Sequence, residues 1–122
     1  MSAAKHLLPA VMLSLAVTFS PGAQSKEQAA DNYHTYCAQC HGVHGNGKGI
    51  NVRDMSVQPR DHTDATAMSA RSDQDITKVI KEGGASINKS VLMPPWSDVF
   101  SDEEVADLVQ YLRTLCKCSH GG

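Results

Sequence analysis

Two cysteines and a histidine stand together in the segment Cys37-Ala38-Gln39-Cys40-His41, and their spacing suits covalent attachment of a haem. In a C-x-x-C-H motif the thiols form thioethers with the former vinyl groups, and the histidine becomes an axial ligand of the iron. A C-x-x-C pair alone would also suit a redox dithiol or half of a zinc site. The adjacent histidine favours haem, and no second C-x-x-C in the sequence completes a four-cysteine zinc site.

A methionine offers the second axial ligand. Met93 begins the segment Met93-Pro94-Pro95-Trp96, in which two prolines hold the backbone extended and stiff. A thioether favours ferrous iron, and a stiff ligand loop limits rearrangement between oxidation states, so His41 with Met93 suits reversible one-electron transfer. Met55, Met68 and His62 are rival ligands without a rigid flank, and an open iron position is a further alternative.

The segment after the motif supplies candidate supporting groups. Residues 42–49 contain four glycines, which indicates a turn with unusual dihedral angles beneath the haem; His44 within it is expected to be exposed. A phosphate-binding loop would need a preceding strand and a following Lys-Ser/Thr pair. The carbonyl of Pro59 is predicted to accept from the His41 ring, and Arg60 to meet a haem propionate. A solvated loop is the alternative for these two residues.

Apolar periodicity predicts short helices at several places along the chain. The first helix is expected over residues 26–36, with the attachment motif at its end and Tyr33 in the core. Residues 50–71 lack clean periodicity and are expected to form a long loop with one helical turn near 65–69.

Two capping boxes mark the later helices. Ser72 opens a helix that is expected to end at Glu82, before Gly83 and Gly84. Ser101, followed by three acidic residues, opens the last helix, where the acidic first turn matches the helix dipole. The buried stripe of this last helix comprises Val105, Leu108, Val109, Leu112 and Leu115, with Tyr111 beside it.

The first 25 residues have the pattern of a cleaved secretory signal peptide. A slightly positive start precedes an apolar run from Leu7 to Phe19 and a stretch of small residues, with cleavage expected after Ser25 or after Ala23. The apolar run is shorter than the roughly 20 residues that span a bilayer, so an uncleaved anchor is the lesser alternative. The pattern predicts export to the periplasm and one mature domain over residues 26–122, with no stable membrane insertion after cleavage.

Charge argues against several classes of partner. Removal of residues 1–25 takes away Lys5 only, leaving 10 basic against 13 acidic residues and a formal net charge of −3. This balance disfavours nucleic acid, and no basic amphipathic helix suggests a membrane surface. Since one-electron transfer needs a donor and an acceptor, the expected partners are redox proteins, whose identities the sequence does not specify.

Over roughly residues 27–115 the chain resembles the small bacterial monohaem class I cytochromes c. The resemblance rests on the C-x-x-C-H segment after a tyrosine-bearing helix, the glycine-rich turn, the Met93-Pro94-Pro95-Trp96 segment and the capped last helix. It implies an all-α cytochrome c fold of three to five short helices wrapped around one haem, in which the first and last helices cross. It also implies that Cys37 and Cys40 carry this single haem c. It also implies that His41 and Met93 ligate the iron, and that Tyr33 packs against Leu108 and Tyr111.

The chain departs from the family pattern in three places. Ala29 stands where the family often has a glycine at the helix crossing, and Pro59 comes later than the usual proline beside the haem histidine. Cys116-Lys117-Cys118 lies outside the common pattern. These two thiols are expected to form a disulfide in a fraying tail; crosslinks between chains, a second attachment chemistry and a metal site with His120 are the alternatives.

The sequence as a whole predicts a periplasmic one-electron carrier and not an enzyme. The alternative is a haem-based gas sensor or a small peroxidase-like enzyme with a labile distal ligand. The stiff Met93 loop and the lack of a well-placed distal His and Arg pair weigh against that alternative.

Overall fold

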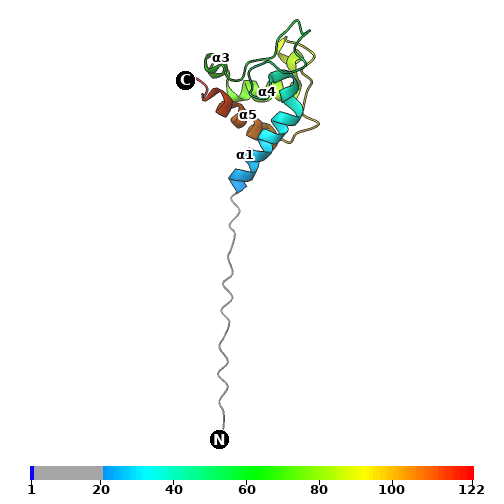
Figure 1. Cartoon of the computed structure of the whole chain (residues 1–122). Coiled ribbons are helices and arrows are strands. Elements are labelled where there is room, and N and C mark those ends of the chain that lie inside the picture. Colours follow the sequence, from blue (N-terminus) through cyan, green and yellow to red (C-terminus); the bar gives the residue numbers. More distant parts are fainter. Residues whose placement is uncertain (2–20) are drawn as a thin grey trace.

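A computed structural model describes Met1 and residues 21–122, and this part of the chain contains helices and no strand (Figure 1). The helices in chain order are α1 (Pro21–Asn32), η1 (Tyr33–Cys37), α2 (Ala38–His41), α3 (Ala65–Ser69), α4 (Asp73–Glu82), η2 (Gly84–Ile87) and α5 (Asp102–Cys116). The all-α expectation is confirmed. The apolar run Leu7 to Phe19 lies outside the described residues. Within the described part, no helix combines the length and apolar character needed to cross a membrane.

The first helical run is longer than the sequence predicted. It extends from Pro21 through α1, η1 and α2 to His41, instead of spanning residues 26–36. The η1 segment is a π-helical turn, closed by the Ala38 N–H donating to the carbonyl of Tyr33. One extra residue in a turn rotates all later side chains by about 100° around the axis. This rotation changes the direction in which Cys37 and the following side chains point. The hydrophobic periodicity of the sequence did not predict the π-helical turn.

Helices α1 and α5 pack against each other, and α5 also packs against α3 and α4 (Figure 1). Ala29 of α1 is only 2% exposed, so its small side chain suits a close approach of the two helices. Tyr33 is buried in the same core as Leu108, and its ring centroid lies 5.2 Å from that of Tyr111, as the family resemblance implied. The core also contains Met68, Ile76, Ile80, Phe100, Val105, Val109, Leu112 and Cys116.

Both capping boxes are confirmed. The Ser72 hydroxyl accepts from the Asp75 N–H, and the Asp75 carboxylate accepts from the Ser72 N–H. Ser101 and Glu104 make the same reciprocal pair at the start of α5. Since each box satisfies N–H groups that the helix itself leaves unpaired, these residues fix where α4 and α5 begin.

A buried arginine, which the sequence did not single out, connects α5 to the segment between α3 and α4. The Arg113 guanidinium is paired with the Asp73 carboxylate at 2.8 Å and donates to the carbonyls of Met68 and Arg71. Its bonds to three acceptors compensate the loss of water around a buried charge. Arg113 therefore fixes the position of α3, and with it Met68, against α5.

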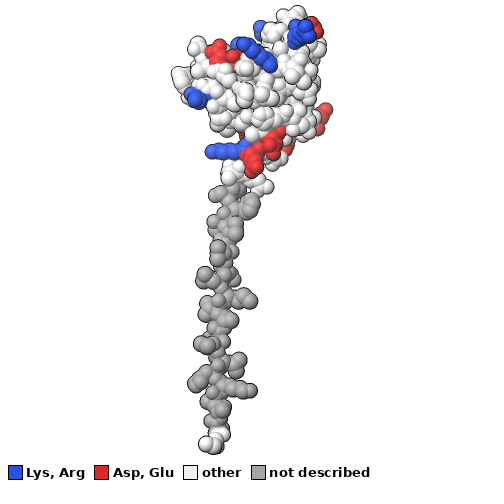
Figure 2. All heavy atoms as spheres, viewed as in Figure 1, with Lys and Arg blue, Asp and Glu red and all other residues white. Residues whose placement is uncertain are grey.

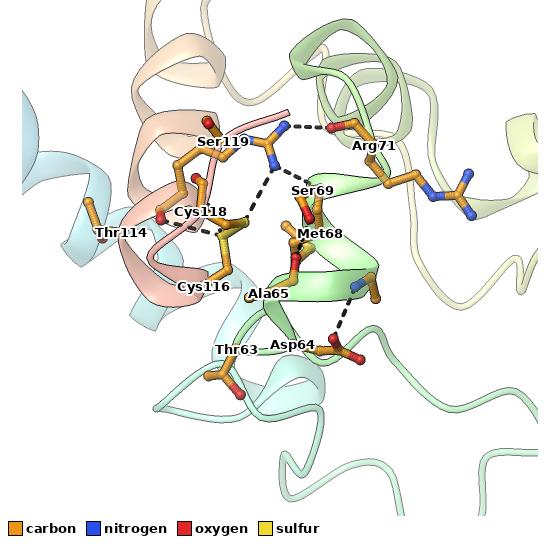
Figure 3. The surroundings of a disulfide bond; sticks show 12 residues. Thr63, Asp64, Ala65, Met68, Ser69, Arg71, Thr114, Cys116, Cys118 and Ser119 are labelled. Carbon is orange, nitrogen blue, oxygen red and sulfur yellow. Dashed lines mark hydrogen bonds between the residues drawn. A yellow bond between two sulfur atoms is a disulfide. The ribbon is translucent and has the colours of Figure 1, made fainter. Parts of the chain in front are cut away.

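The C-terminal cysteines form a disulfide at the end of α5 (Figure 3). The expected pairing of Cys116 with Cys118 is present, but the tail does not fray, because the Gly121 N–H donates to the carbonyl of Ser69. Lys117 between the cysteines adopts a left-handed conformation with φ of 52° and ends the helix.

Candidate functional site

A cavity of about 420 Å³ lies between the helices, and all four predicted haem-binding residues line it. Cys37, Cys40 and His41 come from the end of the first helical run, and Met93 comes from the loop after η2. The rest of the lining is mostly apolar and includes Tyr33, Tyr36, Val57, Met68, Ile76, Ile80, Trp96, Phe100, Leu108 and Leu112. The fold thus brings together residues far apart in the sequence around one apolar space.

The glycine-rich segment holds the C-x-x-C-H turn in place. The last carbonyls of α2 would have no partner within so short a helix. The N–H groups of Gly42, Gly49 and Gly47 donate to the carbonyls of Ala38, Cys40 and His41, respectively, at 2.8 to 3.0 Å. Gly42, Gly45 and Gly47 all have φ between 72° and 83°, which confirms the unusual dihedral angles expected here. His44 is exposed, as predicted.

The ring of His41 is oriented by a backbone carbonyl. Its Nδ1 lies 3.0 Å from the Arg60 carbonyl oxygen, so the prediction that Pro59 supplies this acceptor is wrong by one residue. The Pro59 carbonyl oxygen instead lies close to Gly47. A Cβ atom added to Gly47 would be 2.9 Å from this oxygen. Burial lowers the pKa of His41. A neutral ring whose Nδ1–H donates to Arg60 leaves the Nε2 lone pair free for a metal.

His62 packs against His41 instead of facing it across the cavity. The two rings are stacked, with centroids 4.3 Å apart and planes inclined by 14°. Two histidines that bind one iron from opposite sides must point their ligating nitrogen atoms at each other through the metal. Rings stacked face to face do not have this orientation. The rival assignment of His62 as second ligand to His41 therefore does not fit this geometry.

The Met93 loop is attached to the end of α4. The N–H of Gly84 donates to the Met93 carbonyl at 2.9 Å, and the N–H of Trp96 donates to the Ile80 carbonyl at 3.0 Å. A Cβ on Gly83 would lie 2.8 Å from the Met93 carbonyl oxygen. These contacts hold the methionine beside the cavity, on a segment whose prolines already restrict its backbone.

Two other methionines also line the cavity. Met68 projects from α3 and is only 2% exposed, while Met55 lies in the irregular segment before Gln58. Met68 packs in the hydrophobic core, which is the ordinary role of a buried methionine. Met93 differs from both in its rigid flank.

Three aromatic rings pack together at the cavity wall. Trp96 meets the ring of Tyr36 edge to face at 5.5 Å, and Tyr36 meets Phe100 in the same way at 5.2 Å. Trp96 thus lies at the cavity. The part played by Tyr36 was not predicted, although its spacing of three residues from Tyr33 was a signal that both rings would lie on one side of the helix.

The cysteines of the motif are unpaired and suit attachment better than thiol exchange. Cys37 and Cys40 form no disulfide with each other. Burial raises the pKa of Cys37 to about 11, whereas the attacking thiol of a redox dithiol has a lowered pKa. Within residues 21–122, no three His, Cys, Asp or Glu side chains gather as a metal-ion site would require. Two free thiols beside a histidine and a methionine, in an apolar cavity, fit a covalently held haem.

The helical fold and this motif-bearing cavity define a c-type cytochrome domain of the small class I kind. The chain belongs to the family described as cytochrome c oxidase, cbb3-type, subunit III, whose model matches residues 24–112. Membership supports covalently bound haem c and a role in electron transfer.

Several solved structures are similar to this one, two of which are the following. A chain of the "reducing HAO-like protein complex Kustc0457/Kustc0458" from Kuenenia stuttgartiensis matches with a TM-score of 0.59 and 31% identity, over 73% of this chain. The "KustC0563 c-type cytochrome" matches with a TM-score of 0.57 and 29% identity, over 71% of this chain and 95% of its own length. This chain spans only 41% of the first of these relatives. A search of curated proteins found no match.

Proposed function

We propose that this protein is a one-electron carrier that holds a single haem c and passes electrons between redox partner proteins, without transforming a substrate of its own. The observation that carries the proposal is the convergence of Cys37, Cys40, His41 and Met93 on one apolar cavity. The bound haem would supply an iron that alternates between the ferrous and ferric states.

The residues of this chain would hold and tune that group. Cys37 and Cys40 would attach it, and His41 would ligate the iron through Nε2 while its Nδ1–H remains on the Arg60 carbonyl. Met93 would fill the other axial position from its proline-stiffened loop. A filled coordination sphere in a dry cavity changes little between oxidation states, which favours electron transfer over substrate binding.

The predicted location is the periplasm. The support is the signal-peptide pattern in residues 1–25, together with the attachment motif, because c-type haem is attached in bacteria on the outer side of the cytoplasmic membrane. One of the similar solved chains is part of a protein complex, which supports redox proteins as the expected partners. On the face drawn in Figure 2, acidic and basic side chains are interspersed and no broad patch of one sign is visible. Shape and apolar contact would therefore contribute to docking along with charge.

The test is the optical spectrum of the reduced, purified protein before and after carbon monoxide. Haem staining after denaturing electrophoresis first establishes that the haem is covalently bound. An unchanged spectrum with carbon monoxide is expected, because both axial positions are filled. A shifted spectrum would show an open or labile iron position and would favour the gas sensor or peroxidase-like enzyme.

A further inference from the structure

The disulfide at the end of α5 lies apart from the haem cavity and has its own opening to solvent. Cys118 lines a second hollow of about 550 Å³, together with Lys26, Gln110, Arg113 and Lys117. None of the residues that line this hollow also lines the haem cavity. Cys116, by contrast, is only 4% exposed and packs in the core. Only one of the two sulfur atoms is therefore accessible through the hollow.

The two sulfur atoms also lie in chemically different surroundings (Figure 3). Cys118 Sγ lies 3.9 Å from Nη1 of the Arg113 guanidinium, a cationic donor that favours a thiolate. Cys116 Sγ lies 3.4 Å from the Arg113 carbonyl oxygen and 3.7 Å from the Cys118 carbonyl oxygen. A carbonyl oxygen repels a thiolate but accepts a hydrogen bond from a thiol. Reduction would therefore produce a thiolate at Cys118 and a neutral thiol at Cys116.

A structural role explains this disulfide poorly. A crosslink stabilises a protein mainly by closing a loop in the unfolded chain, and the effect is smallest for the shortest loops. These cysteines are separated by two positions in the sequence. Backbone hydrogen bonds also hold the tail independently of the disulfide. The Cys118 N–H donates to the Arg113 carbonyl, and the Gly121 N–H donates to the Ser69 carbonyl.

We propose that Cys116 and Cys118 form a second redox centre of this chain, a reversible thiol–disulfide site that reacts with thiol compounds entering the hollow at Cys118. An incoming thiolate attacks Cys118 Sγ and forms a mixed disulfide, while Cys116 leaves and takes up a proton. A second thiol attacks the outer sulfur and releases Cys118 as a thiolate. Two thiols are oxidised to one disulfide, and the protein disulfide is reduced by two electrons.

The hollow favours an anionic partner. Lys26 and Lys117 are both exposed on its wall, and the Arg113 guanidinium lies at its base, where Asp73 balances part of its charge. Cations near Cys118 raise the local concentration of an attacking thiolate and stabilise the Cys118 thiolate that is released in the second step. A small anionic thiol such as glutathione and a dithiol protein share this chemistry.

The test uses the haem-loaded protein with reduced glutathione, or with a reduced thioredoxin-type protein, followed by alkylation. Trypsin cleaves after Arg113 and Lys117, so Cys116 and Cys118 fall on separate peptides, residues 114–117 and 118–122. Mass spectrometry is expected to show alkylation of both peptides, and a transient adduct on 118–122 alone. The faster of the two reductants identifies the kind of partner. The proposal is overturned if neither reduces the pair until the protein is unfolded, or if the adduct lies on 114–117.

Two variants test the asymmetry independently. In Cys116→Ser the remaining Cys118 is expected to react with iodoacetamide near neutral pH at least about tenfold faster than Cys116 does in Cys118→Ser. Equal rates, or the reverse order, would contradict the assignment of Cys118. Lys26→Gln is expected to slow the reaction of the wild-type disulfide with glutathione about twofold or more. Lys78→Gln, an exposed change on α4 at a residue that lines neither cavity, is the matched control and should leave the rate unchanged.

Discussion

The ring of His62 stacks on the ring of His41, with centroids 4.3 Å apart and planes inclined by 14°. Burial and the neighbouring His41 lower the pKa of His62 to about 3, so the ring is neutral near pH 7. Its Nδ1 lies 3.4 Å from the Tyr33 hydroxyl, and that hydroxyl donates to the Gly42 carbonyl at 3.1 Å. His62 thus supports His41 from the side and connects it to the helix crossing.

Replacement of His62 is therefore expected to affect stability and not ligation. His62→Ala removes a buried ring and its bond to Tyr33, and should lower the free energy of unfolding by about 2 to 3 kcal/mol. Denaturant unfolding of the haem-loaded protein measures this loss. The spectrum with carbon monoxide should remain that of the wild type.

His62→Phe is the matched control, because it keeps a stacked ring and loses only the hydrogen bond. It should cost about 1 kcal/mol, clearly less than the alanine variant. If His62→Ala instead allowed carbon monoxide to bind, His62 would be an axial ligand and the assignment of Met93 would be wrong.

Met93→Ala is expected to lower the reduction potential and to open the iron to carbon monoxide. The reason is that a thioether stabilises ferrous iron and that no other thioether has a comparably stiff flank. Redox titration and the spectrum with carbon monoxide measure the two effects. Met93→Leu should also lower the potential and admit carbon monoxide, because leucine cannot bind the iron. Since leucine keeps the side-chain volume, the change in packing should alter the free energy of unfolding by less than about 1.5 kcal/mol, apart from the lost ligand bond.

The matched controls are Met55→Leu and Met68→Leu, which change the other two methionines at the cavity. Both should retain the wild-type potential and resist carbon monoxide. A loss of ligation in either control, with Met93→Leu unaffected, would move the second ligand to that residue.

The sequence predicted those parts of the fold that depend on local patterns. The first residues of α4 and α5 follow from the capping residues Ser72 and Ser101, because a capping box is complete within four residues. The short helix α3 was also expected at its observed position, residues 65–69. The attachment motif is equally local, so the sequence identifies Cys37, Cys40 and His41 as residues that line the cavity.

What the sequence did not predict depends on contacts between distant segments. The Arg60 carbonyl reaches His41 only because the intervening loop folds back under α2, and the π-helical turn before Cys37 leaves no periodic signal. Arg113 is buried because its acceptors, Met68 and Arg71, come from other elements. A charged residue on the flank of an apolar stripe is usually exposed, and local reasoning therefore gives the wrong expectation.

Gly83→Ala should disturb the Met93 loop. Gly83 has φ of 79° and ψ of 174°, a region that residues with a side chain rarely adopt, and its new Cβ would lie 2.8 Å from the Met93 carbonyl oxygen. The variant should lose about 1 to 3 kcal/mol of unfolding free energy and should bind carbon monoxide partially.

Gly121→Ala is a control for the effect of a positive φ alone. Its φ is 84°, but no atom lies within 4 Å of the added Cβ, and it stands in the tail away from the cavity. It should leave ligation unchanged. Wild-type resistance to carbon monoxide in Gly83→Ala would show that the Met93 loop does not depend on this glycine.

Asp75 should make the stability of α4 depend on pH in the acid range. Hydrogen bonds from the Ser72 hydroxyl and N–H hold the pKa of Asp75 below its usual value of 3.8. A carboxyl group whose pKa is lower in the folded protein stabilises the fold when it is ionised. This contribution is fully present above about pH 4 and is lost as the pH falls through the lowered pKa.

Asp75→Asn should therefore destabilise the protein near neutral pH and reduce the additional loss of stability below pH 4, as measured by urea unfolding over a pH series. Asp98→Asn, which removes an exposed carboxylate with no hydrogen bond in the described part of the chain, should retain the wild-type pH profile. An Asp75→Asn profile parallel to that of the wild type through the acid range would rule out this linkage.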